Sequence, residues 1–495
     1  MTEDREPAPL FLLDEAEREK LWKALVESIE RYISTIRDLP ASEDPSPEAV
    51  RSLLARVDFA QPMPPDEAVR FAADALTHTQ VHTPHPRYFG LFNPTPTTMG
   101  IAGDALVAAF NPQLAVWKHN PFATEVERFL IRAFGARFGY DPAITDGVMA
   151  SGGSEANHTA LLAALTNAFP DFERTGARGL KGQPVFYVSA ESHHSFHKAA
   201  RLCGIGSGAL REIPVDSELR MQCPELESAI RSDRQSGFVP FLVVGTAGTT
   251  NAGAIDPLAD IAEIAREEGV WFHADAAWGG AAALVPELRP LLAGIERADS
   301  ITLDAHKWLS VPNGAGIFLT KHPEILGRTF HISAAYVPPK AVGDEIIDAY
   351  EHSIHWSRRF IGLKIFLSFA VAGWDGYATT LRRMTAVGDQ LRRDLRAADW
   401  DVVNSTALPI CCFQDRTSPE GRSPDYLEAI AREVIASGRA WISTTRIRKT
   451  IPVLRACITS YRTDAEDLRI LISALNEARS RVQSGKAART ATPQA

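Results

Sequence analysis

The chain has 495 residues, of which 45% are hydrophobic, and its formal net charge is −9. A chain of this length exceeds one ordinary core, so we expect two or three domains. The acidic balance leaves no broad basic surface, so neither nucleic acid nor a membrane is an expected partner.

Cysteine usage indicates the compartment. The five cysteines are scattered and show no CxxC spacing, which favours reduced thiols over a disulfide framework or a cysteine-built zinc site. Residues 1–9 do not have the pattern of a secretory signal, and no apolar run approaches the ~20 residues needed to cross a bilayer. We therefore expect a cytoplasmic protein.

The N-terminal segment reads as helices joined by proline-rich connectors. Over residues 14–36, apolar side chains recur with the period of one helical face: Leu21, Leu25, Ile29, Ile33 and Ile36. A second, shorter helix is expected over 66–76. The apolar face of the first helix must be covered, either by the same chain or by a partner subunit.

Residues 82–96 interleave prolines and histidines with the aromatic residues Tyr88, Phe89 and Phe92. The prolines exclude a regular element here. Rigid loops of this kind line pockets or pack against a core, and the sequence leaves both readings open. After this loop, residues 120–138 read as a helix with Asn120 as its cap.

The middle of the chain alternates short apolar runs with helix-length segments. Strands are predicted over 148–150, 185–188, 241–244, 270–273 and 301–303, and helices over 156–169, 195–203 and 258–268. This alternation favours a mainly parallel sheet in a three-layer α/β domain. Beyond about residue 374, helical segments and β-like runs over 409–413, 440–446 and 454–458 favour a smaller α+β domain.

Several of the predicted strands end in residues suited to chemistry. Gly152, Gly153 and Ser154 follow the first strand and lead into a helix, whose free N–H groups favour a phosphate. The stretch matches neither a Walker loop nor GxGxxG, and an ordinary glycine turn is the competing reading. The glycines at 204–208 follow a helix, so we reject a dinucleotide site there.

Three further strand ends carry polar groups. His193 begins an HHxxH pattern for which stacking on an aromatic ring, a polar helix start and, less favoured, a metal are alternatives. Thr246 closes the next strand. Asp275 ends another, and a buried carboxylate there requires a cation such as a protonated ring nitrogen.

Lys307 follows the last predicted strand within the apolar run Leu303, Ala305, Trp308 and Leu309. Poorly hydrated surroundings favour imine formation by a lysine amine. Taken alone, Lys307 is one of 52 basic residues and a surface lysine is the simpler reading. Together, a phosphate cradle, a stacking histidine, a carboxylate and a lysine are the set that pyridoxal 5'-phosphate requires.

These ordered motifs resemble the group II pyridoxal-phosphate amino-acid decarboxylases, which include the aromatic-L-amino-acid, tyrosine and glutamate enzymes. The resemblance runs from about Asp14 to Val482. It implies Lys307 as the Schiff-base lysine with His306 beside the phosphate, Asp275 at the pyridine nitrogen, and a cofactor site completed by Gly153, Ser154, His193, Thr246, Ala277 and Asp304. Asp304 stands where several members carry asparagine, and a carboxylate there would repel the phosphate.

The resemblance also implies the fold and the assembly. The fold would be the aspartate-aminotransferase type (fold type I), with a mainly parallel seven-stranded sheet. We expect an N-terminal helical clasp over 1–93, a large cofactor-binding domain over 94–376, a small C-terminal domain over 377–484 and a disordered tail over 485–495. A homodimer with its active site at the subunit interface would cover the orphan helical face.

The implied reaction is decarboxylation of an L-amino acid to its amine through an external aldimine and a quinonoid, with Tyr350 as the candidate proton donor. A transaminase, an aldehyde synthase or a cofactor-free binding protein on the same scaffold are the alternatives. Tyr88, Phe89, Phe92, Trp117 and Arg358 are the candidate substrate residues. They favour an aromatic amino acid, with glutamate-like or other polar amino acids as the alternative class, and no metal is expected.

Overall fold

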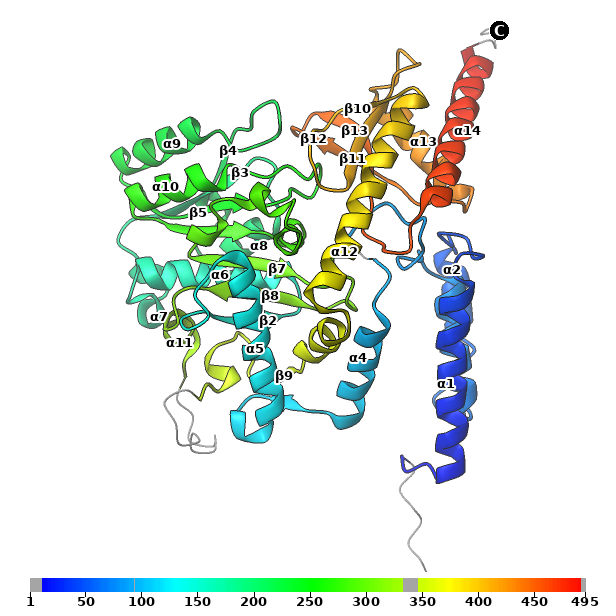
Figure 1. Cartoon of the computed structure of the whole chain (residues 1–495), viewed down its shortest axis with the longest axis horizontal. Helices are drawn as coiled ribbons and strands as arrows, with labels where there is room; N and C mark the ends of the chain where they lie inside the picture. Colours follow the sequence, from blue (N-terminus) through cyan, green and yellow to red (C-terminus); the bar gives the residue numbers. More distant parts are fainter. Residues whose placement is uncertain (1–10, 93, 333–345, 491–495) are drawn as a thin grey trace, which may run out of the picture.

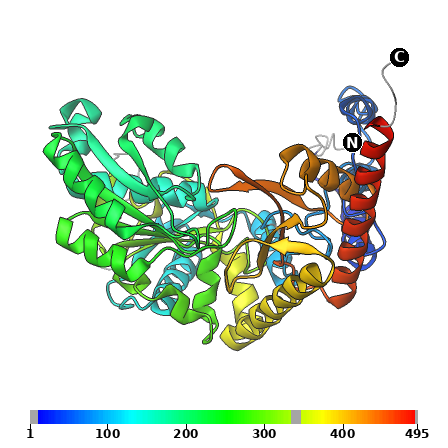
Figure 2. The same ribbon diagram turned by 90° about the horizontal axis from the view of Figure 1, so that it is seen from above.

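The structure is a computed structural model that describes residues 11–92, 94–332 and 346–490, with 486–490 described by backbone alone. The main body holds a seven-stranded sheet, and a four-stranded sheet lies toward the C-terminus. The N-terminal helices stand as a column beside this body (Figure 1). Seen from above, the seven-stranded part occupies one end of the molecule, and the first and last long helices occupy the other (Figure 2).

The large sheet has the strand order β2-β8-β7-β6-β5-β3-β4. Its strands are β2 (Asp146–Ala150), β3 (Pro184–Ser189), β4 (Leu210–Ile213), β5 (Val239–Thr246), β6 (Trp271–Asp275), β7 (Ser300–Asp304) and β8 (Gly316–Thr320). Strand β8 runs antiparallel to β2 and β7, and all other neighbours are parallel. The expected mainly parallel seven-stranded sheet is confirmed.

Helices cover both faces of this sheet. Successive side chains of a strand point to opposite faces, so a strand that is apolar throughout must be covered on both. In β3, Val185 and Tyr187 join one core cluster, and Phe186 and Val188 join the other. The first cluster includes residues of α5 (Pro121–Phe138), α9 (Cys223–Gln235) and α10 (Leu258–Glu268). The second includes residues of α6 (Gly153–Ala168), α8 (Ser195–Leu202) and α11 (Ile325–Phe330). The three-layer prediction is therefore correct.

The C-terminal part is built on an antiparallel sheet of order β10-β11-β13-β12. Its elements are β10 (Trp400–Val402), β11 (Ile410–Asp415), β12 (Ser443–Ile447), β13 (Ile451–Cys457), α13 (Pro424–Ala436) and α14 (Ala465–Thr490). Helix α12 (Gly362–Ala397) connects the two sheets and is broken at Gly373, where φ is 65° and ψ is 175°. The predicted boundary between 376 and 377 falls just beyond this break, and the division into domains stays a prediction.

The N-terminal column consists of α1 (Glu15–Thr35), α2 (Pro47–Leu54) and α3 (Pro65–His78). Asp14 and Glu17 form a reciprocal capping box, which fixes the start of α1. Helix α1 packs along α3, yet Ala24 is the one fully buried residue within α1. The apolar face that we predicted over 14–36 is thus only partly covered by the described part of this chain.

Some elements differ from the prediction. Helices α4 (Thr98–Phe110), α9 and α13 and strands β4 and β8 were not among the elements that we predicted, and neither were the short elements α7 (Phe172–Thr175), β1 (Gln113–Leu114) and β9 (Arg358–Arg359). Helix α4 is apolar on most sides and shows no clear one-sided pattern. Helix α9 is mostly polar, and Leu226 and Ile230 form its short apolar side. Helix α14 continues to Thr490, so the tail predicted from Gly485 is helical over its first part, and 491–495 lie outside the described residues. Within the described ranges, no helix is both long and apolar enough to cross a membrane.

Candidate active site

The polar residues singled out in the sequence meet at one edge of the large sheet. Thr246 closes β5, Asp275 closes β6 and Asp304 closes β7, and these parallel strands end on the same side. In the strand register, Thr246 pairs with Asp275, and Asp275 pairs with Thr302. The carboxyl edge of an open α/β sheet is where ligands bind in such folds.

Lys307 lies just beyond this edge and forms an ion pair with Asp304. Its Nζ is 2.9 Å from Asp304 Oδ2, and the two side chains are 23% and 1% exposed. The flanking residues Leu303, Trp308 and Leu309 are buried, as expected from the apolar run. An amine in this setting is poorly hydrated but keeps an open side, which suits a nucleophilic lysine.

The glycine turn predicted to hold a phosphate approaches the same carboxylate. Helix α6 begins at Gly153, so its first N–H groups face the sheet edge. A Cβ on Gly153 would stand 2.7 Å from Asp304 Oδ2 and 3.4 Å from the Ala277 Cβ. At Gly316, which lies against this turn, a Cβ would meet the Gly152 backbone at 2.7 Å. A Cβ on Gly152 itself would come no closer than 3.4 Å, to His306 Cε1. Close packing therefore favours glycine at 153 and 316.

Asp304 is the least satisfied polar group of the site. Its Oδ1 is buried and has no hydrogen-bond partner among the described residues. The neighbouring His306 accepts a hydrogen bond at Nδ1 from the Ala315 N–H, 3.1 Å away, so its own proton is at Nε2. Burial lowers the pKa of His306 although the nearby Asp304 raises it, which leaves the imidazole neutral near pH 7.

Asp275 is 4% exposed and receives hydrogen bonds only. Asn157 Nδ2 donates to its Oδ2 at 2.9 Å, and the Ala277 N–H donates to its Oδ1 at 3.2 Å. Among the described residues, no lysine or arginine forms an ion pair with Asp275. A buried carboxylate with donors but no cation matches the expectation of a positively charged ligand atom opposite it.

Ser192 joins His193 and Thr246 at this edge, because it precedes His193 in the chain and contacts Thr246 in space. The His193 ring has one exposed side and accepts the Ser195 N–H at Nδ1 over 3.2 Å. Burial of the rest of the ring lowers the pKa of His193, while Asp275 raises it. The Thr246 hydroxyl lies 3.1 Å from the Ser192 hydroxyl. A neutral ring with a free face is suited to stacking on a flat ligand.

The residues present fit pyridoxal phosphate. The helix N-terminus at Gly153 and Ser154 suits a phosphate, Asp275 suits a protonated ring nitrogen, and Lys307 suits an aldehyde. Asp304 is the exception, because its buried carboxylate stands beside the predicted phosphate position. Asparagine would fit that position without repulsion, so Asp304 as a direct phosphate ligand stays a prediction.

Tyr350 lies apart from this cluster in its contacts. It is 6% exposed within η7 (Ala349–Glu351), its hydroxyl lies 3.2 Å from a Glu351 carboxylate oxygen, and its ring stacks on Trp356 at 4.8 Å. Its N–H donates to the Ala115 carbonyl at 3.1 Å. None of these contacts joins it to Lys307, and its role as proton donor stays a prediction.

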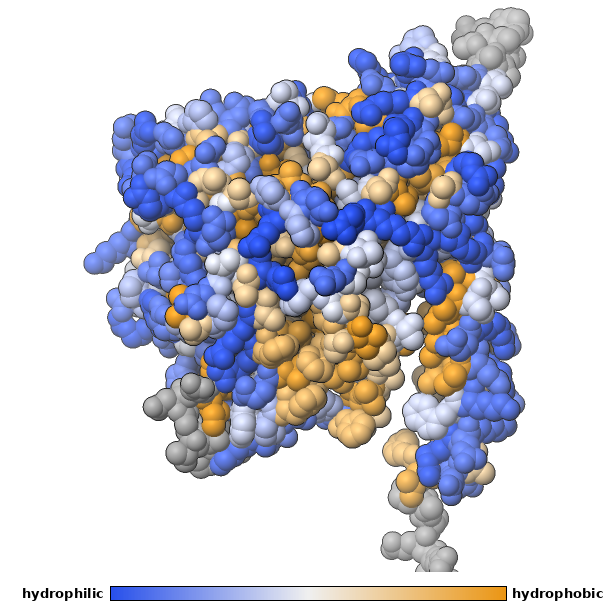
Figure 3. Space-filling model, in the orientation of Figure 1, coloured by the Kyte–Doolittle hydropathy of each residue, from blue (hydrophilic) through white to orange (hydrophobic). Residues whose placement is uncertain are grey.

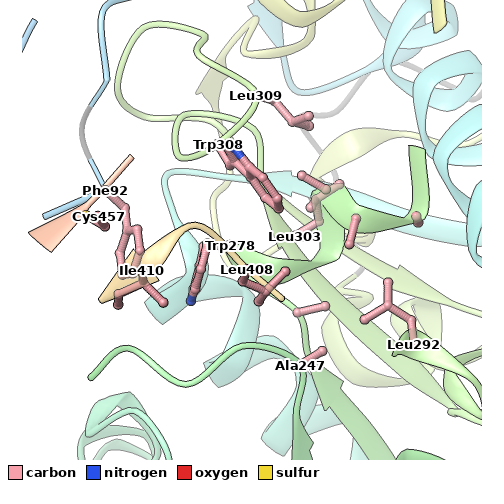
Figure 4. Close-up of a cluster of buried hydrophobic side chains, with 14 of the residues drawn as sticks. Phe92, Ala247, Trp278, Leu292, Leu303, Trp308, Leu309, Leu408, Ile410 and Cys457 are labelled. Atoms are coloured by element: carbon pink, nitrogen blue, oxygen red, sulfur yellow. The ribbon is translucent and has the colours of Figure 1, made fainter. Parts of the chain in front are cut away.

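The aromatic loop packs against the C-terminal part of the chain. Tyr88 stacks on Trp441 at 5.1 Å, and Phe89 is 0% exposed. Phe92 stacks on Trp278 at 4.5 Å within a buried hydrophobic cluster (Figure 4). Core packing accounts for the burial of Phe89 and Phe92, and contact of these three residues with a substrate stays a prediction.

Trp117 and Arg358 are held by acidic side chains. Trp117 Nε1 donates to Glu125 at 2.9 Å, and an Arg358 guanidinium nitrogen is 2.5 Å from Glu127 Oε2. The Arg358 side chain is 9% exposed. A structural role explains these contacts of both residues. Their contact with a substrate stays a prediction.

Sequence reasoning missed several residues that complete the site. Asn157 was quoted only as part of the glycine stretch, although one turn into α6 it faces the sheet edge. Asp256 is fully buried and accepts the N–H groups of Thr246 and Met221 at 2.8 and 2.7 Å. Burial raises the pKa of Asp256 to about 7. Nothing in the local sequence signals either contact, since each joins segments far apart in the chain.

Comparisons with known proteins agree with this geometry. The family model described as the pyridoxal-dependent decarboxylase conserved domain matches residues 52–416. An aromatic-L-amino-acid decarboxylase from Bacillus atrophaeus is 31% identical over 467 residues, which cover 92% of this chain and 94% of the relative. An acidic amino acid decarboxylase from Mus musculus is 30% identical over 445 residues, covering 87% of this chain and 80% of the relative.

Solved structures match over nearly the whole fold. The crystal structure of mouse CSAD has a TM-score of 0.88 at 25% identity and covers 94% of this chain and 99% of its own. The seven-stranded sheet agrees with the family match. The chain therefore belongs to the pyridoxal-phosphate-dependent amino-acid decarboxylases.

Proposed function

We propose that this enzyme decarboxylates an aromatic L-amino acid to its amine, with Lys307, Asp275 and His193 as the residues that touch the cofactor. The observation that carries the proposal is the placement of the Lys307 amine and the cation-free Asp275 carboxylate beyond adjacent strand ends. A helix N-terminus at Gly153 stands beside them.

Each residue would act on the part of the cofactor nearest to it. When bound, the cofactor supplies an electron-accepting ring that stabilises the charge left on the α-carbon as carbon dioxide departs. Lys307 offers its amine to the cofactor aldehyde, and Asp275 holds the proton on the ring nitrogen. The neutral His193 ring would stack on the cofactor ring. Gly153 and Ser154 offer N–H groups to the phosphate.

Arg455 is our candidate for orienting the substrate carboxylate. It is 2% exposed in β13, and its Nε donates to the Thr250 carbonyl at 3.1 Å. Its Nη2 is buried without a hydrogen-bond partner in the described chain. The guanidinium lies 4.8 Å from the ring centre of Phe92, which itself stacks on Trp278. Arg455 Nη1 donates to the Gly90 carbonyl, so Nη2 is the nitrogen left to bind a carboxylate.

The aromatic substrate class is favoured by the ring surface at Phe92 and Trp278 and by similarity to aromatic decarboxylases. The acidic class is the second candidate, because the mouse relative that acts on acidic amino acids is almost as similar. An aldehyde-forming reaction is a third, because a 4-hydroxyphenylacetaldehyde synthase from Rhodiola rosea is 28% identical over 399 residues.

We also propose a homodimer. An apolar groove of about 420 Å³ runs between α1, α3 and the body, lined among others by Leu25, Ile29 and Ile33. Apolar surface lies along the side of the N-terminal column that faces the body. It is also present on the body near α4 (Figure 3). Phe110 at the end of α4 is 80% exposed, and Phe129 on α5 is 60% exposed. A second copy of the chain would cover these surfaces, since large apolar patches mark protein interfaces.

The test is a substrate panel on purified protein, in which carbon dioxide, amine, aldehyde and keto acid are measured with tyrosine, tryptophan, histidine and glutamate. We expect amine and carbon dioxide in equal amounts from at least one aromatic substrate. Borohydride reduction of the yellow protein should leave the cofactor on Lys307.

Lys307→Ala should abolish activity, and the matched control is Lys321→Ala. Lys321 also follows a strand and also pairs with an aspartate, at 3.3 Å from Asp299, but it lies away from the strand ends named above. Aldehyde as the main product would reject simple decarboxylation to the amine, and keto acid as the main product would reject decarboxylation altogether. Preference for glutamate would reject the aromatic class alone.

A further inference from the structure

We propose that Asn157 and His273 act as positioning residues that hold the Asp275 carboxylate in one orientation toward the ring nitrogen of the cofactor. The inference rests on the proposed role of Asp275. It concerns residues behind the carboxylate, inside the sheet, rather than the groups that touch the cofactor.

Asn157 links helix α6 to the end of β6. It is 1% exposed, and its Nδ2 donates to Asp275 Oδ2 at 2.9 Å and to the Ser195 hydroxyl at 3.0 Å. Both amide hydrogens are therefore used. The amide oxygen then accepts a hydrogen bond, and it lies 3.2 Å from His273 Nε2. The Thr302 hydroxyl also lies 3.3 Å from this nitrogen. A proton of His273 on Nε2 would satisfy the amide oxygen of Asn157.

The other side of the His273 ring is compatible with the same tautomer. His273 is 0% exposed, and its Nδ1 lies 2.8 Å from the Ser300 hydroxyl. That hydroxyl oxygen accepts the indole N–H of Trp271 at 2.9 Å, so its single hydrogen is available for Nδ1. Burial lowers the pKa of His273 to about 4, which keeps the ring neutral at pH 7.

The hydrogen bonds thus run in one direction, from Trp271 through Ser300, His273 and Asn157 to Asp275. Each residue orients the next. If His273 loses its Nε2 donor, the Asn157 amide is free to rotate and to present its oxygen to the carboxylate, which is repulsive. A buried network of this kind contributes more stabilisation than one isolated hydrogen bond, because all of its polar groups must be satisfied together.

The experiment measures cofactor binding rather than turnover. Full-length protein is stripped of cofactor and titrated with pyridoxal phosphate, or with a deaza analogue in which carbon replaces the ring nitrogen. The dissociation constant is followed by quenching of tryptophan fluorescence and by the visible absorbance. The variants are Asn157→Asp, which keeps the side-chain shape but places an acceptor beside Asp275, and His273→Leu.

We expect each variant to weaken pyridoxal phosphate binding by about 10-fold or more, since hydrogen bonds to a charged group are among the stronger ones. Binding of the deaza analogue should change by less than about twofold, because that analogue offers Asp275 no charged nitrogen. His273→Gln should restore much of the affinity, because its carboxamide offers an N–H near the position of Nε2.

Equal losses for both cofactors would show a merely structural role and would overturn the inference. Unchanged affinity for pyridoxal phosphate would overturn it as well. Both results leave the proposed function intact. Failure of the wild-type protein to attach pyridoxal phosphate at Lys307 would instead reject the proposed function itself.

Discussion

At the carboxyl edge of the large sheet, the Asp304 carboxylate lies close to Gly153 and limits the space at the predicted phosphate position. Asp304 has a short side chain fixed at the end of β7, and its Oδ2 is held by Lys307 at 2.9 Å. A Cβ on residue 153 would crowd this oxygen. The glycine at 153 is therefore a steric requirement.

Gly153→Ala should weaken cofactor binding by about 1–3 kcal/mol, the usual cost of overpacking. The added Cβ would stand 2.7 Å from Asp304 Oδ2. The matched control is Gly152→Ala, whose Cβ would meet its nearest neighbour, His306 Cε1, at 3.4 Å. Titration with pyridoxal phosphate measures both. Equal affinities for the two variants would contradict the steric argument.

His273 also predicts a dependence of stability on pH. Its pKa is lowered from 6.5 to about 4 by burial, so between these values the unfolded chain binds a proton that the folded chain does not. The stabilisation is complete above pH 6.5 and is lost as the pH falls toward 4. At about 1.4 kcal/mol per pKa unit, the loss is on the order of 3 kcal/mol.

The measurement is the free energy of urea unfolding between pH 7 and 4 for the wild-type protein and for His273→Gln. The variant should lose less stability over this range. His85, whose pKa burial lowers to about 3, contributes acid sensitivity to both proteins and cancels in the comparison. Parallel pH profiles would count against a neutral, buried His273.

At the scale of elements, helix α6 has a double role. Its N-terminus at Gly153 provides the predicted phosphate site, and one turn later Asn157 contacts Asp275 on β6. Its alanine-rich apolar residues are buried against the sheet, which fixes the helix axis relative to β7 and β8. A single rigid element therefore sets the distance between the phosphate end and the ring-nitrogen end of the cofactor.

At the scale of the whole molecule, the N-terminal column and the body leave apolar surface uncovered. Ile29→Glu would place a charge in the groove between α1 and the body. We expect this variant to sediment with the mass of one chain, whereas the wild-type protein sediments with the mass of two, because burying an unpaired charge is costly.

The control is Leu202→Glu, which also exchanges an apolar residue for a charge. Leu202 is 72% exposed at the end of α8, outside the groove. This variant should keep the mass of the wild-type protein. A wild-type chain that sediments as a monomer at micromolar concentration would reject the proposed dimer.

Much of this protein follows from its sequence. Alternating apolar runs and helix-length segments predicted the sheet, because a strand buried on both faces must be apolar throughout. Lys307, Asp275, His193 and Gly153 were found by their places at strand ends. Helix α4 was missed because it lacks a one-sided pattern. Strand β8 was missed although its apolar run is as long as that of β7.

Other features depend on contacts between distant segments, and these only the tertiary structure decided. It showed that Asn157 and His273 stand behind Asp275, that Phe89 is closed into the core, and that Glu127 holds Arg358. The sequence determined which chemical groups lie at the strand ends, because hydrophobic periodicity is local. The tertiary structure determined which of them meet, because hydrogen bonds and ion pairs depend on distances in space that no local pattern encodes.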